Sequence, residues 1–343
     1  MFGCAVFDGH GGDVAAKFCT QELPALVAQR IAMDPRNPCR KEIESSPLRS
    51  PITAATTATT TTSIPLMSSD RSNQNVAVVN TSLNTTSTSA TAAAATMPTL
   101  TMPTLPWDSH VELAEWDYIC DALVQGFLQC EEQFNQTASQ IHCSAGAAGV
   151  LVLLNGNDLY VANVGDSRAV LCRSEFGKAQ CHRLTQIHKY TKFECEFERV
   201  QKAGANFSCD GYVNGQIEVT RSIGDFQQNS NNGCTEKIKG LTAFPHVSKV
   251  TLTECDEFLI VATDGLWDAL KEETAVSCCR RVLRRNPNCS EAAHFLIKNA
   301  QIHSTNLQTN DNVSVVVIGF ARPDEKGRWP LDLHLSTIDP CPN

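Results

Sequence analysis

The chain has 343 residues, of which 42% are hydrophobic and only 6% aromatic, so it can bury one large aliphatic core or two modest ones. Its 28 Lys and Arg residues against 37 Asp and Glu residues give a net charge of −9, which with no basic run argues against a nucleic-acid partner. No apolar stretch approaches the roughly 18 residues of a membrane span, and the 16 cysteines lack C-x-x-C spacing, so we expect a protein of the cytoplasm, with the nucleus as an alternative, that has no membrane partner and holds free thiols in preference to disulfides.

The first segment predicts a strand, a loop and a helix. Phe2–Phe7 is an apolar run that suits a buried strand, and Asp8–Gly12 reads as a glycine-rich turn. Asp13 can cap the helix that follows, and Pro24 is expected to kink or restart it. One face of this helix carries Ala15, Phe18, Cys19 and Leu23.

The composition changes abruptly between about residues 50 and 106. This stretch consists mostly of Thr, Ser, Ala, Asn and Pro, its only charged residues are Asp70 and Arg71, and it holds no Cys. We predict a low-complexity, disordered insertion in a surface loop, because the entropy of loop closure grows slowly with length. A neutral expansion is favoured over a regulatory arm rich in hydroxyl groups.

The middle of the chain predicts a helix followed by a hairpin. Helical spacing runs through Val111–Phe134. Ala147–Leu154 and Asp158–Val164 then read as two strands joined by a turn at residues 155–157, and Ala169–Arg173 reads as a further strand.

The C-terminal half mixes apolar runs with amphipathic stretches. Helices are predicted over a stretch from Phe193 that ends at Gly204, over Glu272–Arg284, and from a cap at Ser290 to about His303; strands are predicted over Val247–Leu252, Glu257–Thr263 and Val313–Phe320. Because hairpins lie in the middle and helices are grouped before and after, we predict an α+β fold of two packed antiparallel β-sheets flanked by helices. Residues 1–320 would form one domain, and residues 321–343 a peripheral tail.

Three aspartates recur in one kind of setting, at one end of a buried strand. Asp8 and Asp264 follow apolar runs, and Asp311 immediately precedes one. Converging carboxylates repel one another unless a hard cation such as Mg²⁺ or Mn²⁺ lies between them. Two such ions can hold a water and lower its pKa for attack on phosphorus. Each motif alone is weak, since an Asp-Gly pair is usually a turn, and their order along the chain gives them weight.

Six short motifs span residues 2 to 320. They are D-G-H-G-G from Asp8, G-D-S-R from Gly165, L-T-x-x-H-K from Leu184, R-S-I-G-D from Arg221, A-T-D-G-L-W-D from Ala262 and D-N-V-S from Asp311. Together they resemble the signatures of the type 2C (PPM-type) metal-dependent serine/threonine protein phosphatases. Two positions depart from that pattern, because Ile187 stands where Asp is usual and Thr220 where Ser is usual.

The resemblance implies roles for five residues of a site with two catalytic Mg²⁺ or Mn²⁺ ions. Asp8 would bridge the two ions, and the backbone carbonyl of Gly9 would join it on one of them. Asp264 and Asp311 would complete the coordination of the other ion. His10 would be the general acid that protonates the departing Ser or Thr oxygen.

The same resemblance implies a third, weaker ion held by Asp166 and Asp268 together with Asp264. For Asp166 and Asp268, a structural role in turn capping and strand pairing is an equal alternative to metal binding. Three other charged residues of the motifs are expected to be structural, in an internal ion pair and a turn: Arg168, Arg221 and Asp225.

A full-length member of that family carries an upstream strand with an Arg that grips the phosphate and a Glu-Asp pair whose Glu ligates one metal. This chain starts seven residues before Asp8, so we expect either a longer natural protein or a weak short form. Without that strand, backbone groups of the sheet would stay unpaired.

Two functions follow as hypotheses. The favoured one is a hydrolase that removes phosphate from phosphoserine and phosphothreonine in protein substrates. The alternative is a pseudophosphatase that binds phosphoproteins or kinases without turnover. A monomer is expected in both cases.

Overall fold

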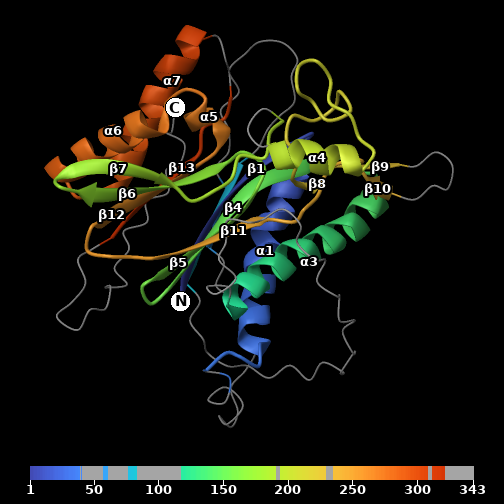
Figure 1. The fold of residues 1–343 in the computed structure, drawn as a ribbon, viewed down its shortest axis with the longest axis horizontal. Helices are drawn as coiled ribbons and strands as arrows, with labels where there is room; N and C mark the ends of the chain where they lie inside the picture. Colours follow the sequence, from blue (N-terminus) through green and yellow to red (C-terminus); the bar gives the residue numbers. More distant parts are fainter. Residues whose placement is uncertain are drawn as a thin grey trace.

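The computed structural model describes residues 1–38, 40, 57–60, 76–82, 117–190, 194–228, 235–307 and 311–320. These residues form four layers, with two antiparallel sheets packed face to face and helices on both outer faces (Figure 1). This arrangement confirms the predicted α+β fold.

The first sheet has the strand order β11-β5-β4-β1-β3-β2, with the short β8 paired to β4. Its central strand β1 pairs antiparallel with β4 on one side and β3 on the other. The strands are β1 (Phe2–His10), β2 (Thr57–Thr60), β3 (Val76–Ser82), β4 (Gly146–Asn155), β5 (Asp158–Val164), β8 (Ile223–Gly224) and β11 (His246–Thr251).

The second sheet has the order β13-β12-β6-β7, so β7 lies at its edge. Its strands are β6 (Arg168–Glu175), β7 (Lys178–Arg183), β12 (Asp256–Ala262) and β13 (Val315–Gly319). A separate ribbon consists of β9 (Phe226–Gln228) and β10 (Thr235–Lys237).

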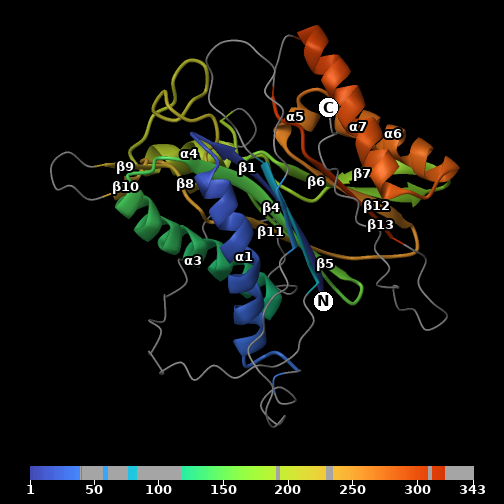
Figure 2. The same cartoon turned by 180° about the vertical axis from the view of Figure 1, so that it is seen from behind.

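Helices cover the two outer faces. Figures 1 and 2 show α1 and α3 on the first sheet, and α6 and α7 on the second. The helices are α1 (Val14–Met33), α3 (Tyr118–Ile141), α4 (Glu194–Lys202), α5 (Asp264–Trp267), α6 (Glu272–Arg285) and α7 (Cys289–Leu307).

Strand β1 is apolar on both faces because both faces are buried. Phe7 joins the cluster under α1 and α3, whereas Val6 joins the cluster between the two sheets, where it meets Val261 of β12. A third cluster, which includes Ile260, fills the space under α6 and α7. Alternate residues of one strand therefore enter different cores, so packing holds β1 on both faces.

The segment predicted as a disordered insertion contributes two strands. Residues 57–60 and 76–82 form β2 and β3, and β3 pairs with β1 from Phe2↔Ser82 to Asp8↔Val76. At these residues the structure has strands in place of the predicted loop, because the edge of β1 offers backbone groups to a nearby β-prone run such as Val76–Val79. The rest of the stretch from 50 to 106, and the tail 321–343, lie outside the described residues.

Several local predictions need correction. The predicted turn at Asp8–Gly12 is strand as far as His10, and the chain turns at Gly11 and Gly12, whose φ values are +67° and +127°. Pro24 lies inside a single continuous helix α1. The helix predicted from Val111 is described only from Tyr118, where Asp117 caps it, and it runs on to Ile141.

Two further predictions differ near the C-terminal half. The cap of α7 is Asn288 and not Ser290, because its side chain accepts the backbone N–H groups of Ser290 and Glu291. The edge strand β7 was not predicted, since its sequence is largely polar.

The described helices contain none with the length and apolarity needed to cross a membrane. Every described cysteine is a free thiol.

Candidate active site

Asp8 and His10 reach the site from the end of β1. They are two residues apart on one strand, so both side chains point to the same face. The Asp8 side chain is buried, and its Oδ1 atom has no hydrogen-bond partner among the described residues. Gly9 lies between them within the strand. The turn at Gly11 and Gly12 then leads into α1, which fixes the strand end.

Asp264 and Asp311 come from two adjacent chain segments. Asp264 begins α5 directly after β12, and Asp311 lies just before β13. A Cβ atom on Gly265 would overlap the carbonyl oxygen of Asn312, so glycine allows the two segments to touch. Backbone bonding adds to this contact, since the Thr263 N–H donates to the Ser314 carbonyl at 3.1 Å.

Asp166 enters from the turn between β5 and β6, where it meets a lysine. Lys189 Nζ lies 2.7 Å from Asp166 Oδ2, 3.0 Å from Glu218 Oε1 and 3.9 Å from Asp264 Oδ2. The ammonium group therefore lies between the carboxylates and neutralises part of their charge. Asp268 is more peripheral, with a side chain that is 66% exposed and 3.9 Å from Arg168.

The crowding of these carboxylates shifts their pKa values. Burial first, and then the negative charges of Asp311 and Asp166, raise the pKa of Asp8 to about 7. Burial and the charges of Asp166 and Asp8 raise the pKa of Asp264 well above its usual value. Partial desolvation also raises the pKa values of Asp311 and Asp268, although both residues are exposed at the surface. Removing the charge of any one of these aspartates should therefore lower the pKa values of the others.

The same carboxylates favour the charged form of Lys189. Burial acts to lower its pKa, but the carboxylates of Asp166, Asp264 and Glu218 outweigh burial and raise it. The lysine therefore stays charged in the cluster.

His10 is held by an aspartate from a distant part of the chain. His10 Nε2 lies 2.7 Å from Asp225 Oδ1, and Asp225 Oδ2 accepts the hydroxyl of Ser222 at 2.5 Å. Burial acts to lower the pKa of His10, but the charge and hydrogen bond of Asp225 outweigh it, so the net shift is upward. A Cβ atom on Gly146 would overlap the Asp225 carboxylate, which shows how closely β4 packs against this pair.

The donor set suits a hard divalent cation. The Oδ1 atoms of Asp8 and Asp264 are buried without a hydrogen-bond partner among the described residues, and the neighbouring carboxylates repel them. Oxygen ligands of this kind are what Mg²⁺ and Mn²⁺ prefer. Among the described residues no group of three or more His, Cys, Asp or Glu side chains is arranged as a ready set of ligands. The Lys189 ammonium lies beside two of these carboxylates, those of Asp166 and Asp264.

The structure thus brings together Asp8, Asp166, Asp264 and Asp311 and places Asp268 at the margin. It separates the three residues that the sequence grouped as structural. Arg221 is buried and pairs with Glu196 at 2.6 Å, and Arg168 pairs with Glu272 at 3.1 Å. Asp225 instead contacts His10.

Sequence reasoning missed two contacts of the site. Lys189 was noticed only as part of the L-T-x-x-H-K motif, and nothing in its spacing indicates that it meets Asp166. Asp225 is separated from His10 by 215 positions. The positive φ of Asp225, 58°, marks a constrained backbone position that the R-S-I-G-D motif only suggested.

Comparisons with known proteins point to one family. A family model described as "Protein phosphatase 2C" matches residues 86–308. That range includes Asp166, Asp264 and Asp268, whereas Asp8, His10 and Asp311 lie outside it.

Two curated relatives illustrate the sequence similarity. "Probable protein phosphatase 2C 13" of Arabidopsis thaliana is 38% identical over 187 residues, 54% of this chain and 46% of that protein. "Protein phosphatase 2C homolog 2" of Hypocrea jecorina (strain QM6a) is 33% identical over 217 residues, 62% of this chain and 48% of that protein. The chain spans about half the length of the curated relatives it matches.

Solved structures share the fold at low sequence identity. A serine-threonine phosphatase 2C from Toxoplasma gondii superposes with a TM-score of 0.58 at 18% identity, over 93% of this chain and 85% of that one. A C. elegans sex determining protein gives a TM-score of 0.55 at 18% identity, over 92% of this chain and 55% of that one.

Proposed function

Because this chain belongs to the protein phosphatase 2C family, we propose that it hydrolyses phosphoserine and phosphothreonine in protein substrates and releases inorganic phosphate. The observation that carries the proposal is the meeting of Asp8, Asp264 and Asp311 beside a histidine that Asp225 holds in place. These groups come from separate segments of the chain, so their convergence is a property of the fold.

The carboxylates supply the cation-binding half of the proposal. Asp8, with the backbone carbonyl of Gly9, and the pair Asp264 and Asp311 would hold two Mg²⁺ or Mn²⁺ ions. Asp166 and Asp268 would contribute to a weaker third site, for which Lys189 competes. Bound there, the ions would supply positive charge to the phosphate and acidify a water.

His10 supplies the acid. A water attacks phosphorus, the bond from phosphorus to the serine or threonine oxygen breaks, and His10 gives a proton to that departing oxygen. Asp225 is a positioning residue: its carboxylate accepts from the imidazole and favours the protonated form. The hydroxyl of Ser222 fixes the other oxygen of that carboxylate, so the imidazole is held in one orientation.

We place this activity in the cytoplasm or the nucleus. The free thiol state of every described cysteine supports a reducing compartment.

The deciding experiment is phosphate release from a phosphothreonine peptide. Turnover should require Mn²⁺, stop in chelator, and disappear in Asp264→Asn. Asp210→Asn, an exposed aspartate that accepts a hydrogen bond from Ser208, is the matched control and should retain full turnover. Absence of turnover, with the phosphopeptide still bound, would replace the hydrolase with the pseudophosphatase.

A further inference from the structure

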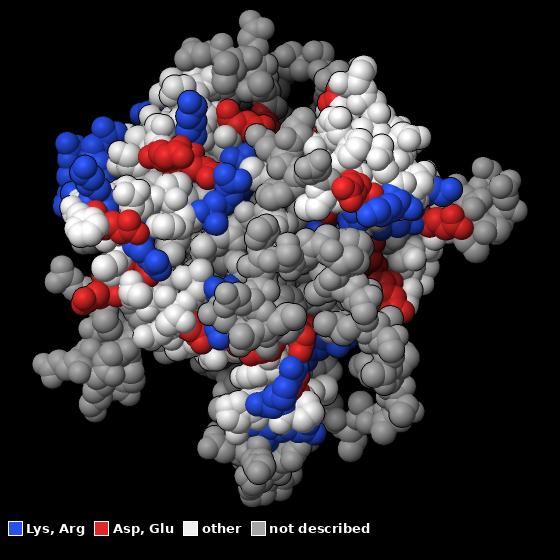
Figure 3. Space-filling model, viewed as in Figure 1, with Lys and Arg blue, Asp and Glu red and all other residues white. Residues whose placement is uncertain are grey.

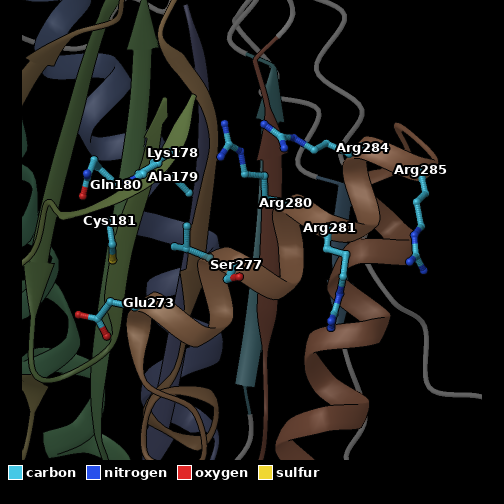
Figure 4. Close-up of a pocket in the computed structure, with 11 residues that line it drawn as sticks. Lys178, Ala179, Gln180, Cys181, Glu273, Ser277, Arg280, Arg281, Arg284 and Arg285 are labelled. Carbon is cyan, nitrogen blue, oxygen red and sulfur yellow. The ribbon is translucent and has the colours of Figure 1, made fainter. Parts of the chain in front are cut away.

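A basic groove lies between the edge strand β7 and helix α6, apart from the carboxylate cluster. Its volume is about 710 Å³, a size usual for binding sites. Figure 4 shows residues of β7 on one wall and the arginines of α6 on the other. The charged residues that line it are Lys178, Arg280, Arg281, Arg284, Arg285 and Glu273.

One of these cations belongs to the fold. Arg280 is buried, donates to both oxygens of Glu257 at 2.6 Å, and also bonds the carbonyl of Gly177 and the hydroxyl of Ser174. These bonds use four of the five N–H groups of the guanidinium, so we read Arg280 as part of the buried floor of the groove.

The other cations form no ion pair within the part of the chain that the structure describes. Lys178, Arg281, Arg284 and Arg285 are all exposed. Arg281 lies over the Phe295 ring at 5.7 Å, a contact that leaves its charge uncompensated. In Figure 3 basic atoms gather at the edge of the molecule where Figure 1 places α6 and β7. This is a concentrated positive field on a chain whose net charge is −9.

The arginines of α6 are spaced so that they repel one another, and the stability of the helix does not require this arrangement. Arg281 and Arg285 are four positions apart and Arg281 and Arg284 three, so like charges face each other on one side of α6 and destabilise it slightly. The negative end of the helix favours Arg284 and Arg285 in its last turn. It does not account for Arg281, which lies before the last turn. Lys178 faces Glu175 in the β6–β7 register and adds a further positive charge to the groove, and this excess of positive charge suits an external anion.

Strand β7 indicates what kind of anion. It pairs with β6 on one side, and among the described residues no strand pairs with its other side. A free edge presents N–H and carbonyl groups that an extended peptide can pair with, whereas a lipid surface or a nucleic acid cannot pair in register with it. From Glu273 to Arg285 α6 spans about 18 Å, the length of about six extended residues.

We propose that the groove between β7 and α6 binds an extended acidic segment of a partner protein as an added strand on β7. Side chains of a strand alternate between its two faces, so acidic residues at every second position would meet Arg281, Arg284 and Arg285. This docking site is separate from the proposed hydrolysis, and its test needs no turnover.

The test measures binding of labelled ten-residue peptides to the full chain by fluorescence anisotropy. One peptide alternates Glu with Thr; a second has the same composition with the five Glu residues contiguous; a third alternates Glu with Pro and cannot pair with an edge strand. The alternating Glu-Thr peptide should bind at least about tenfold more tightly than either of the others, and more weakly as salt rises.

Variants locate the site. Arg284→Glu combined with Arg285→Glu should weaken binding at least about tenfold, and Lys178→Glu on the opposite wall should weaken it separately. Lys239→Glu with Lys298→Glu, which changes two exposed lysines outside the groove by the same charge, should leave binding unchanged. Thermal unfolding confirms that each variant is folded.

Three outcomes would overturn the proposal. The first is equal binding of all three peptides, which would mean attraction by charge alone. The second is that an equally charged oligothymidine, or vesicles of anionic phosphatidylserine, bind more tightly than the alternating Glu-Thr peptide and lose this binding in the variant Arg284→Glu with Arg285→Glu. The third is no binding of any peptide.

Discussion

His10 Nε2 and Asp225 Oδ1 lie 2.7 Å apart, although 215 positions separate the two residues in the chain. The carboxylate is fully buried and its second oxygen is bound by Ser222. The Asp225 carboxylate, itself fixed by Ser222, therefore holds the His10 imidazole at Nε2. This arrangement is typical of a residue that transfers a proton.

We expect Asp225→Asn to lower kcat about 10- to 100-fold on a phosphothreonine peptide, with little change in KM. The defect should be much smaller on 4-nitrophenyl phosphate, because nitrophenolate leaves without a proton. His10→Gln should show the same contrast, and Asp210→Asn should show no defect. An equal loss on both substrates would mean that Asp225 only supports the fold.

Lys189→Met should increase the affinity for Mn²⁺. The ammonium group now lies 2.7 Å from Asp166 and 3.9 Å from Asp264, so a cation shared by these carboxylates must displace it. We expect about tenfold tighter binding by titration calorimetry, about 1.4 kcal/mol. Lys249→Met, which removes a lysine paired with Asp117 and Asp158, is the matched control. Unchanged Mn²⁺ affinity in Lys189→Met would contradict the competition.

Asp264→Asn should change stability in opposite directions with and without a metal. In chelator the free energy of unfolding should rise by about 1 kcal/mol, because a partly buried charge that its neighbours repel is removed. Added Mn²⁺ should stabilise the variant less than the wild type. Urea unfolding in chelator and in Mn²⁺ gives both quantities. A variant that is less stable than the wild type in chelator would count against carboxylate repulsion.

His246 should make the fold sensitive to mild acid. Burial, and then the charge of Arg221, lower its pKa to about 4 from an ordinary value of 6.5. The unfolded chain takes up a proton as pH falls below about 6.5 and the folded chain does not. The contribution to stability is therefore complete above that pH and is lost towards pH 4, by about 3 kcal/mol in all.

The variant His246→Gln should remove much of this pH dependence. Urea unfolding at pH 7.5 and pH 5 should show a smaller loss of stability in the variant than in the wild type. His303→Gln, at an exposed position of α7, should lose as much as the wild type. Equal losses in His246→Gln and the wild type would assign the acid sensitivity to other groups, of which the buried His188 is the first to examine.

The layered fold and much of the cluster could be predicted because both depend on local patterns. Apolar runs gave β1, β4, β5 and β12, and an aspartate at the end of such a run is carried to the sheet end. The partners of these residues could not be predicted. Asp225 meets His10, and Lys189 meets Asp166, only in the folded chain, and no local pattern marks either contact. Pro24 shows the same limit, since packing of its buried ring within α1 overrides its tendency to break a helix.

The pairing of β3 with β1 has a consequence for anyone who shortens this chain. The segment between α1 and α3 looks dispensable by composition, yet Val76–Ser82 occupies one whole edge of the strand that carries Asp8. Excising it would leave a long apolar ribbon of unpaired amides, which another molecule could pair with in its place. Residues 76–82 therefore cover an edge that could otherwise pair with a second molecule. A shortened chain should keep them as a tethered strand.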